Sequence, residues 1–223
     1  MQTSLVSRSC ALLSIVLVLQ ACGTSGPTRS DAGAREVPSV DAATADGVGM
    51  EPVPERAIQA YDRALAAMLN GDTTEAELEL EQLILEYPEY PGPHVNLAIV
   101  YRQSGRATDA REALERALAL DDNHAAAHNQ LGILLRSEGD FAAAEAAYLR
   151  AIAADPDYAL AHYNLGVLLD LYLRRPEEAL EHYERFQGML AEPNQQVALW
   201  IIDLRRRLGV PGDAARVAQE ETS

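Results

Sequence analysis

The 223-residue chain has only two cysteines, Cys10 and Cys22, and both lie near its N-terminus. The sequence after residue 22 therefore has no disulfide, no thiolate metal site and no cysteine nucleophile. It also has no glycine-rich nucleotide loop, paired-carboxylate motif, Ser/His/Asp signature or cofactor motif. These absences predict a protein that is not an enzyme and that holds neither a cofactor nor a metal ion.

Positive charge is scarce as well. Arg and Lys total 18 against 34 Asp and Glu, which gives a formal net charge of −16. A chain this acidic repels nucleic acid and anionic lipid, so neither is an expected partner. The charge favours solubility and basic partner proteins instead.

The N-terminal apolar run is too short to cross a membrane. It follows Arg8, the only charged side chain before residue 29, and extends from Ala11 to Leu19. A membrane-spanning helix takes roughly 20 apolar residues. A short apolar run between a positive residue and small residues is typical of a signal peptide, which we place at residues 1–21.

The end of this run, Leu19-Gln20-Ala21-Cys22, resembles the lipobox of bacterial lipoproteins. In that family the cysteine is acylated and the peptide is cut just before it, so the resemblance implies a lipid on Cys22. Two acyl chains attach a protein stably, whereas one alone is marginal. Gly23 in place of Asp implies, by the sorting rule of enteric bacteria, an outer-membrane anchor facing the periplasm. The alternative is an ordinary signal peptide with an incidental cysteine.

Residues 22–54 have a composition that does not support a packed core. They are rich in Gly, Ala, Ser, Thr, Asp and Pro and contain no aromatic residue. We expect a flexible tether with a reach of roughly 30 Å. The alternative is an arm that lies on the domain that follows.

The remainder of the chain repeats itself every 34 residues. This offset links Gly71, Gly105 and Gly139, and it also links the segments Asn96-Leu97-Ala98, Gln130-Leu131-Gly132 and Asn164-Leu165-Gly166. A fixed period of this size indicates a stack of similar supersecondary units. Abundant Ala and the lack of strand-like alternation make these units helical. A stack offers a long surface and usually no catalytic cleft, which favours a binding scaffold.

The pattern resembles the tetratricopeptide repeat family, whose unit is a helix-turn-helix of 34 residues. In residues 125–158, Gly132 lies where two helices are expected to cross, and Gly139-Asp140 makes the turn. The resemblance implies an all-α solenoid over residues 55–192. Its four units are about 57–90, 91–124, 125–158 and 159–192. The last unit has one extra residue, and Arg174-Arg175-Pro176 replaces the Gly-Asp turn.

One more helix is expected after Pro193. An apolar stripe at helical spacing comprises Val197, Trp200, Ile201, Leu204 and Leu208. We predict a capping helix over residues 193–209, stopped by Gly209, and a disordered tail over 210–223. The run Arg205-Arg206-Arg207 suits the negative end of a helix dipole, and contact with an anionic surface is the alternative.

The resemblance also implies a surface for a partner, because the first helices of such units line a concave face. The implied groove residues are Asn96, Ile99, Arg102, Asn129, Gln130, Ile133, Arg136, Tyr163, Asn164 and Val167. Asn96, Gln130 and Asn164 form an amide ladder that can pair with the backbone of an extended peptide. The apolar members add contact area, and the two arginines can select an acidic residue. Alternatively, the ladder amides bond only within their own helix pairs.

Histidines recur with the same period. His94, His128 and His162 lie in successive units, which are displaced by about 10 Å. Metal–nitrogen bonds are about 2 Å long, so these three side chains cannot share one ion. We interpret each as a small aromatic packed between helices. Weak chelation by His124 and His128, which are four residues apart, is the alternative.

These patterns predict a lipid-anchored scaffold of the bacterial cell envelope that binds peptide segments of other proteins. Similar outer-membrane repeat lipoproteins include pilotins, which help to assemble type IV pilus secretins, and scaffolds for cell-wall hydrolases. Pilotins usually carry about six units, and four are visible here. The alternatives are a soluble periplasmic or cytoplasmic repeat protein with an incidental lipobox, and a regulatory subunit of an envelope enzyme.

Overall fold

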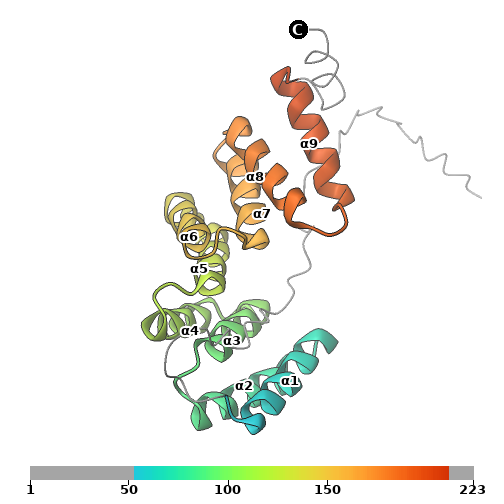
Figure 1. Ribbon diagram of the computed structural model, residues 1–223. Helices are drawn as coiled ribbons and strands as arrows, with labels where there is room; N and C mark the ends of the chain where they lie inside the picture. Colours follow the sequence, from blue (N-terminus) through green and yellow to red (C-terminus); the bar gives the residue numbers. More distant parts are fainter. Residues whose placement is uncertain (1–52, 211–223) are drawn as a thin grey trace, which may run out of the picture. The chain divides into compact units, whose positions relative to one another are not determined.

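The computed structural model describes residues 53–210, and all regular structure in this range is helical (Figure 1). The predicted all-α fold is confirmed. The predicted signal peptide, most of the predicted tether with Cys22, and nearly all of the predicted tail lie outside the described residues. The helices are α1 (Glu55–Asn70), α2 (Thr73–Glu86), α3 (Pro91–Gln103), α4 (Ala107–Leu120), α5 (Ala125–Ser137), α6 (Phe141–Ala154), α7 (Ala159–Val167), the π-helix η1 (Leu168–Tyr172), α8 (Pro176–Met189) and α9 (Gln195–Leu208).

The helices pack in consecutive pairs, α1 with α2, α3 with α4, α5 with α6 and α7 with α8. We call the first member of each pair a first helix and the other a second helix. Each second helix also contacts the first helix of the next pair, and α3, α5 and α7 contact one another in order (Figure 1). Within residues 53–210, no helix is both long and apolar enough to cross a membrane.

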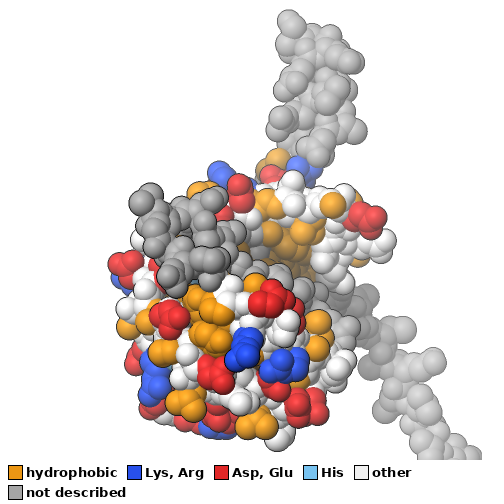
Figure 2. Space-filling model, turned by 60° about the horizontal axis from the view of Figure 1, so that its bottom comes forward, with side chains coloured by type: hydrophobic (Ala, Val, Ile, Leu, Met, Phe, Trp, Pro, Cys, Tyr) orange, Lys and Arg blue, Asp and Glu red, His pale blue; other side chains and the backbone are white. Residues whose placement is uncertain are grey.

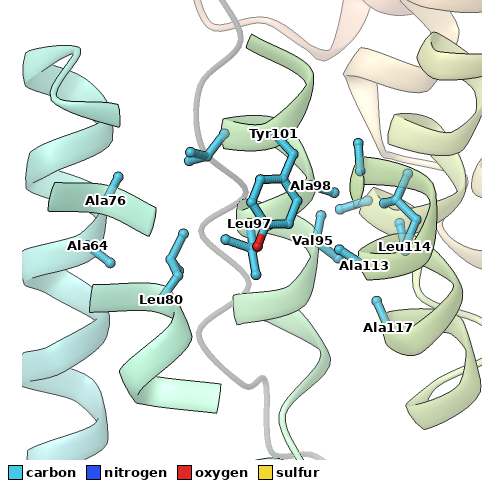
Figure 3. Close-up of a cluster of buried hydrophobic side chains, with 14 of the residues drawn as sticks. Ala64, Ala76, Leu80, Val95, Leu97, Ala98, Tyr101, Ala113, Leu114 and Ala117 are labelled. Carbon is cyan, nitrogen blue, oxygen red and sulfur yellow. The ribbon is translucent and has the colours of Figure 1, made fainter. Parts of the chain in front are cut away.

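Small residues let the two helices of each pair approach closely. A Cβ atom on Gly132 would lie 2.5 Å from the ring of Tyr148, and one on Gly166 would lie 2.7 Å from the ring of Tyr183. The expectation that Gly132 marks a helix crossing is therefore confirmed. The first two pairs have alanine and leucine at the equivalent places, and Ala64, Leu80, Ala98 and Leu114 share one buried cluster (Figure 3). Glycine thus accompanies a large second-helix residue, and alanine a smaller one.

The extra residue of the fourth unit is absorbed by η1. The Leu173 N–H donates to the Leu168 carbonyl at 3.0 Å, which is the i to i−5 bond of a π-helix. As a result, the left-handed turn position held by Gly139 (φ +84°) in the third unit falls on Arg174 (φ +55°) in the fourth. A side chain in this conformation costs roughly 1 kcal/mol, so the insertion leaves local strain at the turn.

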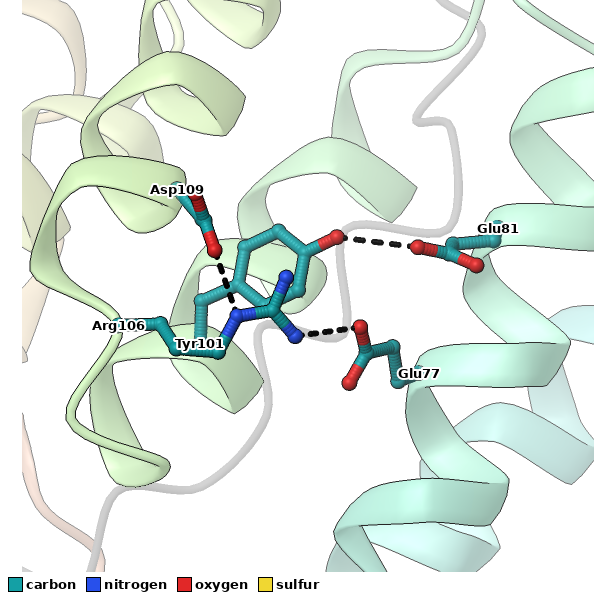
Figure 4. Close-up of polar contacts among 5 residues, drawn as sticks. All are labelled: Glu77, Glu81, Tyr101, Arg106 and Asp109. Atoms are coloured by element: carbon teal, nitrogen blue, oxygen red, sulfur yellow. Dashed lines mark hydrogen bonds and ion pairs between the residues drawn. The ribbon is translucent and has the colours of Figure 1, made fainter.

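Arginine side chains join neighbouring helix pairs. We call an arginine that precedes a second helix and bonds both to a carboxylate of that helix and to a glutamate of the preceding pair an arginine clasp. Arg106 precedes α4 and donates to Glu77 of α2 at 2.6 Å and to Asp109 at 2.5 Å, and its guanidinium lies 4.1 Å from the Tyr101 ring centroid (Figure 4). The Tyr101 hydroxyl donates to Glu81 of the preceding pair at 3.1 Å. The carboxylates, that of Glu77 above all, raise the pKa of Arg106.

The same clasp recurs at the junction between the third and fourth units. Arg175 precedes α8 and donates to Glu145 of α6 at 2.6 Å and to Glu178 in the first turn of α8. Arg106 and Glu77 are 29 residues apart, whereas Arg175 and Glu145 are 30 apart, because η1 adds one residue. The clasps therefore fix neighbouring units to each other on the second-helix side.

The two ends of the described stack differ. Over α1 and α2, which come forward in Figure 2, acidic, basic and apolar side chains are mixed, and no patch of one sign dominates. At the other end, α9 buries Val197, Trp200 and Leu204 against the fourth unit. Its opposite side exposes Leu199 and Ile202. The predicted apolar stripe of this helix therefore faces the core.

Candidate functional site

The ten residues predicted to line a groove lie on α3, α5 and α7, and we call the side of these helices that carries them the first-helix face. Eight of them are buried, while Arg102 and Arg136 are half-buried. Ile133, Tyr163 and Val167 belong to a buried cluster that also contains Phe186 and Trp200. These apolar members therefore form the floor of the face and contribute to the core.

Two of the three ladder amides bond to the preceding first helix. The Asn96 side chain donates to the Tyr61 hydroxyl at 2.6 Å, and the Asn164 side chain donates to Asn129 Oδ1 at 3.0 Å. In both cases the sixth residue of one unit bonds to the fifth residue of the unit before it. The amides thus act as ties between units, which neither sequence alternative anticipated.

Gln130 departs from this pattern because the fifth residue of the preceding unit is Val95, which has no polar side chain. Gln130 Oε1 is buried and has no hydrogen-bond partner among the described residues, and the same is true of Asn129 Nδ2. A buried polar group without a partner costs about 1–3 kcal/mol. One donor and one acceptor on adjacent residues of α5 can pair with the C=O and N–H of a polypeptide backbone.

Charge on the face changes sign along the array. Arg102 and Arg136 occupy the twelfth position of the second and third units, and Asp170 occupies it in the fourth. The Asp170 side chain is 3% exposed and accepts from Arg207 of α9 at 3.1 Å. The carboxylate of the fourth unit is therefore neutralised by α9.

The arginines that end α9 are engaged within the protein. Besides the bond from Arg207, Arg205 pairs with Glu184 at 2.9 Å and Arg206 pairs with Asp203 at 2.7 Å. These pairs support the interpretation that the basic run belongs to the helix end. The side chain of Arg206 is 79% exposed and that of Arg207 is 47% exposed, so contact with an anionic surface stays an alternative.

The three periodic histidines are buried, and two of them bond to backbone. The Nε2 atoms of His128 and His162 lie 2.8 and 3.2 Å from the carbonyls of Asp122 and Pro156, in the turn before each helix. His124 Nδ1 accepts from the Ala127 N–H at 3.2 Å, so this nitrogen caps α5 and does not face a metal ion with His128. Over residues 53–210 there is no group of three or more side chains able to hold a metal ion.

A histidine pair that the sequence analysis missed lies between α7 and α8. His162 Nδ1 is 2.9 Å from His182 Nδ1. Because His162 Nε2–H donates to the Pro156 carbonyl, its Nδ1 accepts the proton of His182. Burial, with the charge of a protonated His162 next, lowers the pKa of His182 to about 4. The sequence did contain a signal for this pair, because His182 departs from the repeat pattern. The two preceding units have alanine, Ala113 and Ala147, at the position of His182.

Comparison with known proteins decides the family. Sequence profiles described as tetratricopeptide repeat match residues 59–90, 95–159 and 129–189. The chain belongs to the tetratricopeptide repeat family. Regions of such repeats are typically non-catalytic and bind proteins or peptides. No curated protein matches this tetratricopeptide repeat protein.

Solved structures share the fold of this tetratricopeptide repeat protein. PilF from Pseudomonas aeruginosa is 24% identical with a TM-score of 0.62, and 69% of each chain is covered. MamA is 25% identical with a TM-score of 0.54, over 71% of this chain and 95% of that one. The O-GlcNAc transferase of Thermobaculum terrenum is 27% identical with a TM-score of 0.54, over 61% of this chain but only 27% of the enzyme. Repeats of this kind therefore also occur within an enzyme chain.

Proposed function

We propose that this tetratricopeptide repeat protein is a non-catalytic scaffold that binds an extended segment of a partner protein on the first-helix face. The observation that carries the proposal is the pair of buried polar atoms, Asn129 Nδ2 and Gln130 Oε1, that lack partners among the described residues. An extended backbone presents one N–H and one C=O per residue, which are the groups that an unpaired amide acceptor and donor require. The remaining amides are occupied in ties between units, so this site lies where the second unit meets the third.

Two substitutions test whether the free amide atoms bind a ligand. Gln130→Met keeps the length of the side chain but removes the unpaired acceptor, so stability is expected to stay or rise while binding weakens. Asn96→Ala removes a tie to Tyr61, so it should lower stability and leave binding at Gln130 in place. If Gln130→Met leaves every captured partner unchanged, the amides are structural and the proposal is wrong.

Partners are best captured with a photoreactive residue, because the chain contains no lysine for amine-directed crosslinkers. Benzoylphenylalanine in place of Gln103 puts the probe at the exposed end of α3, beside the first-helix face. The matched control replaces Ala153, which is exposed on the second helix α6. A partner of the face is crosslinked from residue 103 and not from residue 153. Equal capture from both positions counts against a site on this face.

The proposed location is the outer membrane, with the protein anchored through a lipid on Cys22 and facing the periplasm. Support comes from the segment Leu19-Gln20-Ala21-Cys22 after a short apolar run. Labelling cells with palmitate tests the anchor, and the two cysteines provide a matched pair. Cys22→Ala should abolish labelling, and Cys10→Ala should not. An unlabelled, soluble wild-type protein would instead indicate an ordinary periplasmic or cytoplasmic repeat protein.

The proposed role within the envelope is assembly or positioning of pilus, secretion or cell-wall machinery. The likeness to PilF at 24% identity supports the fold only. The envelope role therefore depends on the anchor and on the identity of the crosslinked partner. Capture of an envelope enzyme whose activity changes with this protein would make the chain a regulatory subunit instead.

A further inference from the structure

We infer that the histidine pair, His162 on α7 and His182 on α8, is an acid-sensitive contact, and that protonation of both rings unfolds the fourth unit and α9 while the three preceding units stay folded. The two Nδ1 atoms lie 2.9 Å apart, and the ring centroids lie 5.2 Å apart. His162 is 2% exposed, which leaves its ring little room to turn away. Because the pair joins the two helices of the fourth unit, that unit loses its packing when the rings move apart.

The pair can form only while at least one ring is neutral. A carbonyl accepts but does not donate, so His162 Nε2–H donates to the Pro156 carbonyl at 3.2 Å and its Nδ1 carries a lone pair. His182 donates to this lone pair. When both rings are protonated, both Nδ1 atoms carry hydrogen, and the bond between them cannot form. The folded fourth unit therefore excludes the doubly protonated pair.

The charged groups around the pair compensate little for a second proton. Burial is the largest cause of the lowered pKa of each imidazole, and Arg185 on α8 lowers both pKa values further. Asp157 and Glu178 each raise the pKa of one imidazole, but Glu178 is bonded to Arg175. Charged residues on the other elements packed against α7 and α8 are held in ion pairs, namely Glu145 on α6 with Arg175, Asp170 on η1 with Arg207, and Arg205 on α9 with Glu184. The second proton is therefore bound more easily once the unit has opened.

The direction of the pH dependence follows from the difference between the folded and the open fourth unit. The pKa of an exposed histidine is about 6.5, whereas both imidazoles of the folded pair have lower pKa values. Below pH 6.5 the open state therefore binds more protons, and the equilibrium moves toward opening as the pH falls. Each proton taken up raises the opening constant up to about tenfold per pH unit, so the pair raises it up to about 100-fold.

The position of the pair in the array confines the opening to the C-terminal end. The second and third units have Ala113 and Ala147 at the position of His182, so their histidines, His94 and His128, have alanine there instead of a second imidazole. The fourth unit has another unit on one side only, and α9 packs on α8. Each unit of a stack is stabilised by its own contacts and by those to its neighbours, so a terminal unit can unfold while the others stay folded.

Opening also changes the first-helix face. The face includes Tyr163, Asn164 and Val167 on α7, and the bond from Asn164 to Asn129 on α5 is lost when α7 unfolds. Under the proposed function, a partner that contacts this part of the face is therefore released in acid. The acid sensitivity of the histidine pair does not itself depend on that function.

Trp200 reports the opening directly, because it is the single tryptophan of the chain and lies on α9. It is 5% exposed, and its ring centroid lies 5.5 Å from that of Tyr183 on α8. Urea unfolding of the full chain is followed by Trp200 emission and by far-ultraviolet circular dichroism, which reports all helices. The two midpoints should coincide at pH 7, whereas at pH 5 the Trp200 midpoint should lie at lower urea. Coincident midpoints at pH 5 would overturn the inference.

Variants of the pair identify the groups that take up the protons. Between pH 6.5 and pH 5, the opening constant from Trp200 emission should rise up to about 100-fold per pH unit in the wild type. His182→Gln keeps a donor for His162 Nδ1 but does not titrate, so the rise should be at most about tenfold. His182→Ala recreates the alanine of the preceding units and should give the same reduced rise, which covers the case in which glutamine does not fit.

The matched control is His94→Gln, which removes a buried histidine of the second unit. This variant should keep the wild-type pH dependence of Trp200 emission. If both His182 variants also keep it, or if His94→Gln reduces it equally, the histidine pair is not the acid-sensitive element and the inference is wrong.

Discussion

The glycine at each crossing of the last two helix pairs leads to a quantitative prediction for Gly132→Ala. The added methyl carbon would lie 2.5 Å from Tyr148 Cε1 and 2.6 Å from Cδ1, well inside an ordinary contact of about 3.5–4.0 Å. The Tyr148 side chain is fully buried and cannot turn out to solvent. Overpacking a tight core costs about 1–3 kcal/mol. Replacing a helical glycine with alanine gains about 1 kcal/mol, so the net loss should be about 0–2 kcal/mol.

Gly188→Ala provides the matched control, because Gly188 also lies in a helix and a Cβ atom there meets nothing within 4 Å. This control should be stabilised by up to about 1 kcal/mol. The difference between the two variants therefore isolates the clash, at about 1–3 kcal/mol. Urea unfolding followed by circular dichroism measures both. The m-values should agree, since a changed m would mean that single units unfold separately.

A double-mutant cycle identifies the ring as the cause. Tyr148→Leu recreates the alanine–leucine pairing of Ala98 and Leu114 when it is combined with Gly132→Ala, so the clash should disappear. The coupling energy between the two sites should then be about 1–3 kcal/mol. Additive effects, or a Gly132→Ala protein as stable as Gly188→Ala, would refute the explanation of glycine by the facing aromatic ring.

Three further predictions concern the turn, the histidine pair and the clasp. Arg174→Gly should raise the free energy of unfolding by about 0.5–1 kcal/mol, because φ is +55° at this residue and glycine adopts this conformation without strain. Urea unfolding measures the change, and a lower free energy of unfolding would contradict the explanation by backbone strain. The pKa of His182 is about 4 in the folded protein and about 6.5 when unfolded, so its contribution to stability is present above pH 6.5 and is lost as the pH falls toward 4. The urea midpoint of His182→Ala should therefore decrease less than that of the wild type between pH 7 and pH 4.5. If both midpoints decrease equally, other groups cause the acid sensitivity. Arg106→Ala should lower the thermal midpoint more at low salt than in 1 M NaCl, because salt screens the ion pairs of Arg106 with Glu77 and Asp109. A decrease that does not depend on salt would instead indicate that only the contact with the Tyr101 ring contributes.

The sequence was sufficient for the architecture because the fold depends on a period. Gly71, Gly105 and Gly139 recur at the left-handed turn position, and each has a φ between +74° and +84°. Local conformational preference and spacing both point to the same helix pairs, and neither requires knowledge of distant contacts. The sequence also showed where the 34-residue period is interrupted by one extra residue, because Arg174-Arg175-Pro176 replaces the Gly-Asp turn there.

The way in which the slip is absorbed could not be predicted. One extra residue can enter a loop, a turn or a helix, and the choice depends on which hydrogen bonds the neighbouring helices permit. Here it enters the first helix as a π-turn, so the core contacts of Leu168 and Leu169 are kept and the strain moves to Arg174. The hydrogen bonds between units could not be predicted either. The bond from Asn96 to Tyr61 joins residues 35 apart, and a 34-residue period does not indicate that pairing.

The amide ties distinguish one junction of the array from the others. Where the fifth residue of the preceding unit is Tyr61 or Asn129, the next amide bonds to it, which stabilises the junction and occupies the donor. Where the fifth residue is Val95, no such bond forms, and separately the acceptor Oε1 of Gln130 is buried without a hydrogen-bond partner among the described residues. Under the proposed function, a single apolar residue in the pattern of a stack of nearly identical units marks its binding position. The energetic cost of leaving that acceptor unpaired falls on the free protein, and under the proposed function a bound backbone N–H offsets it.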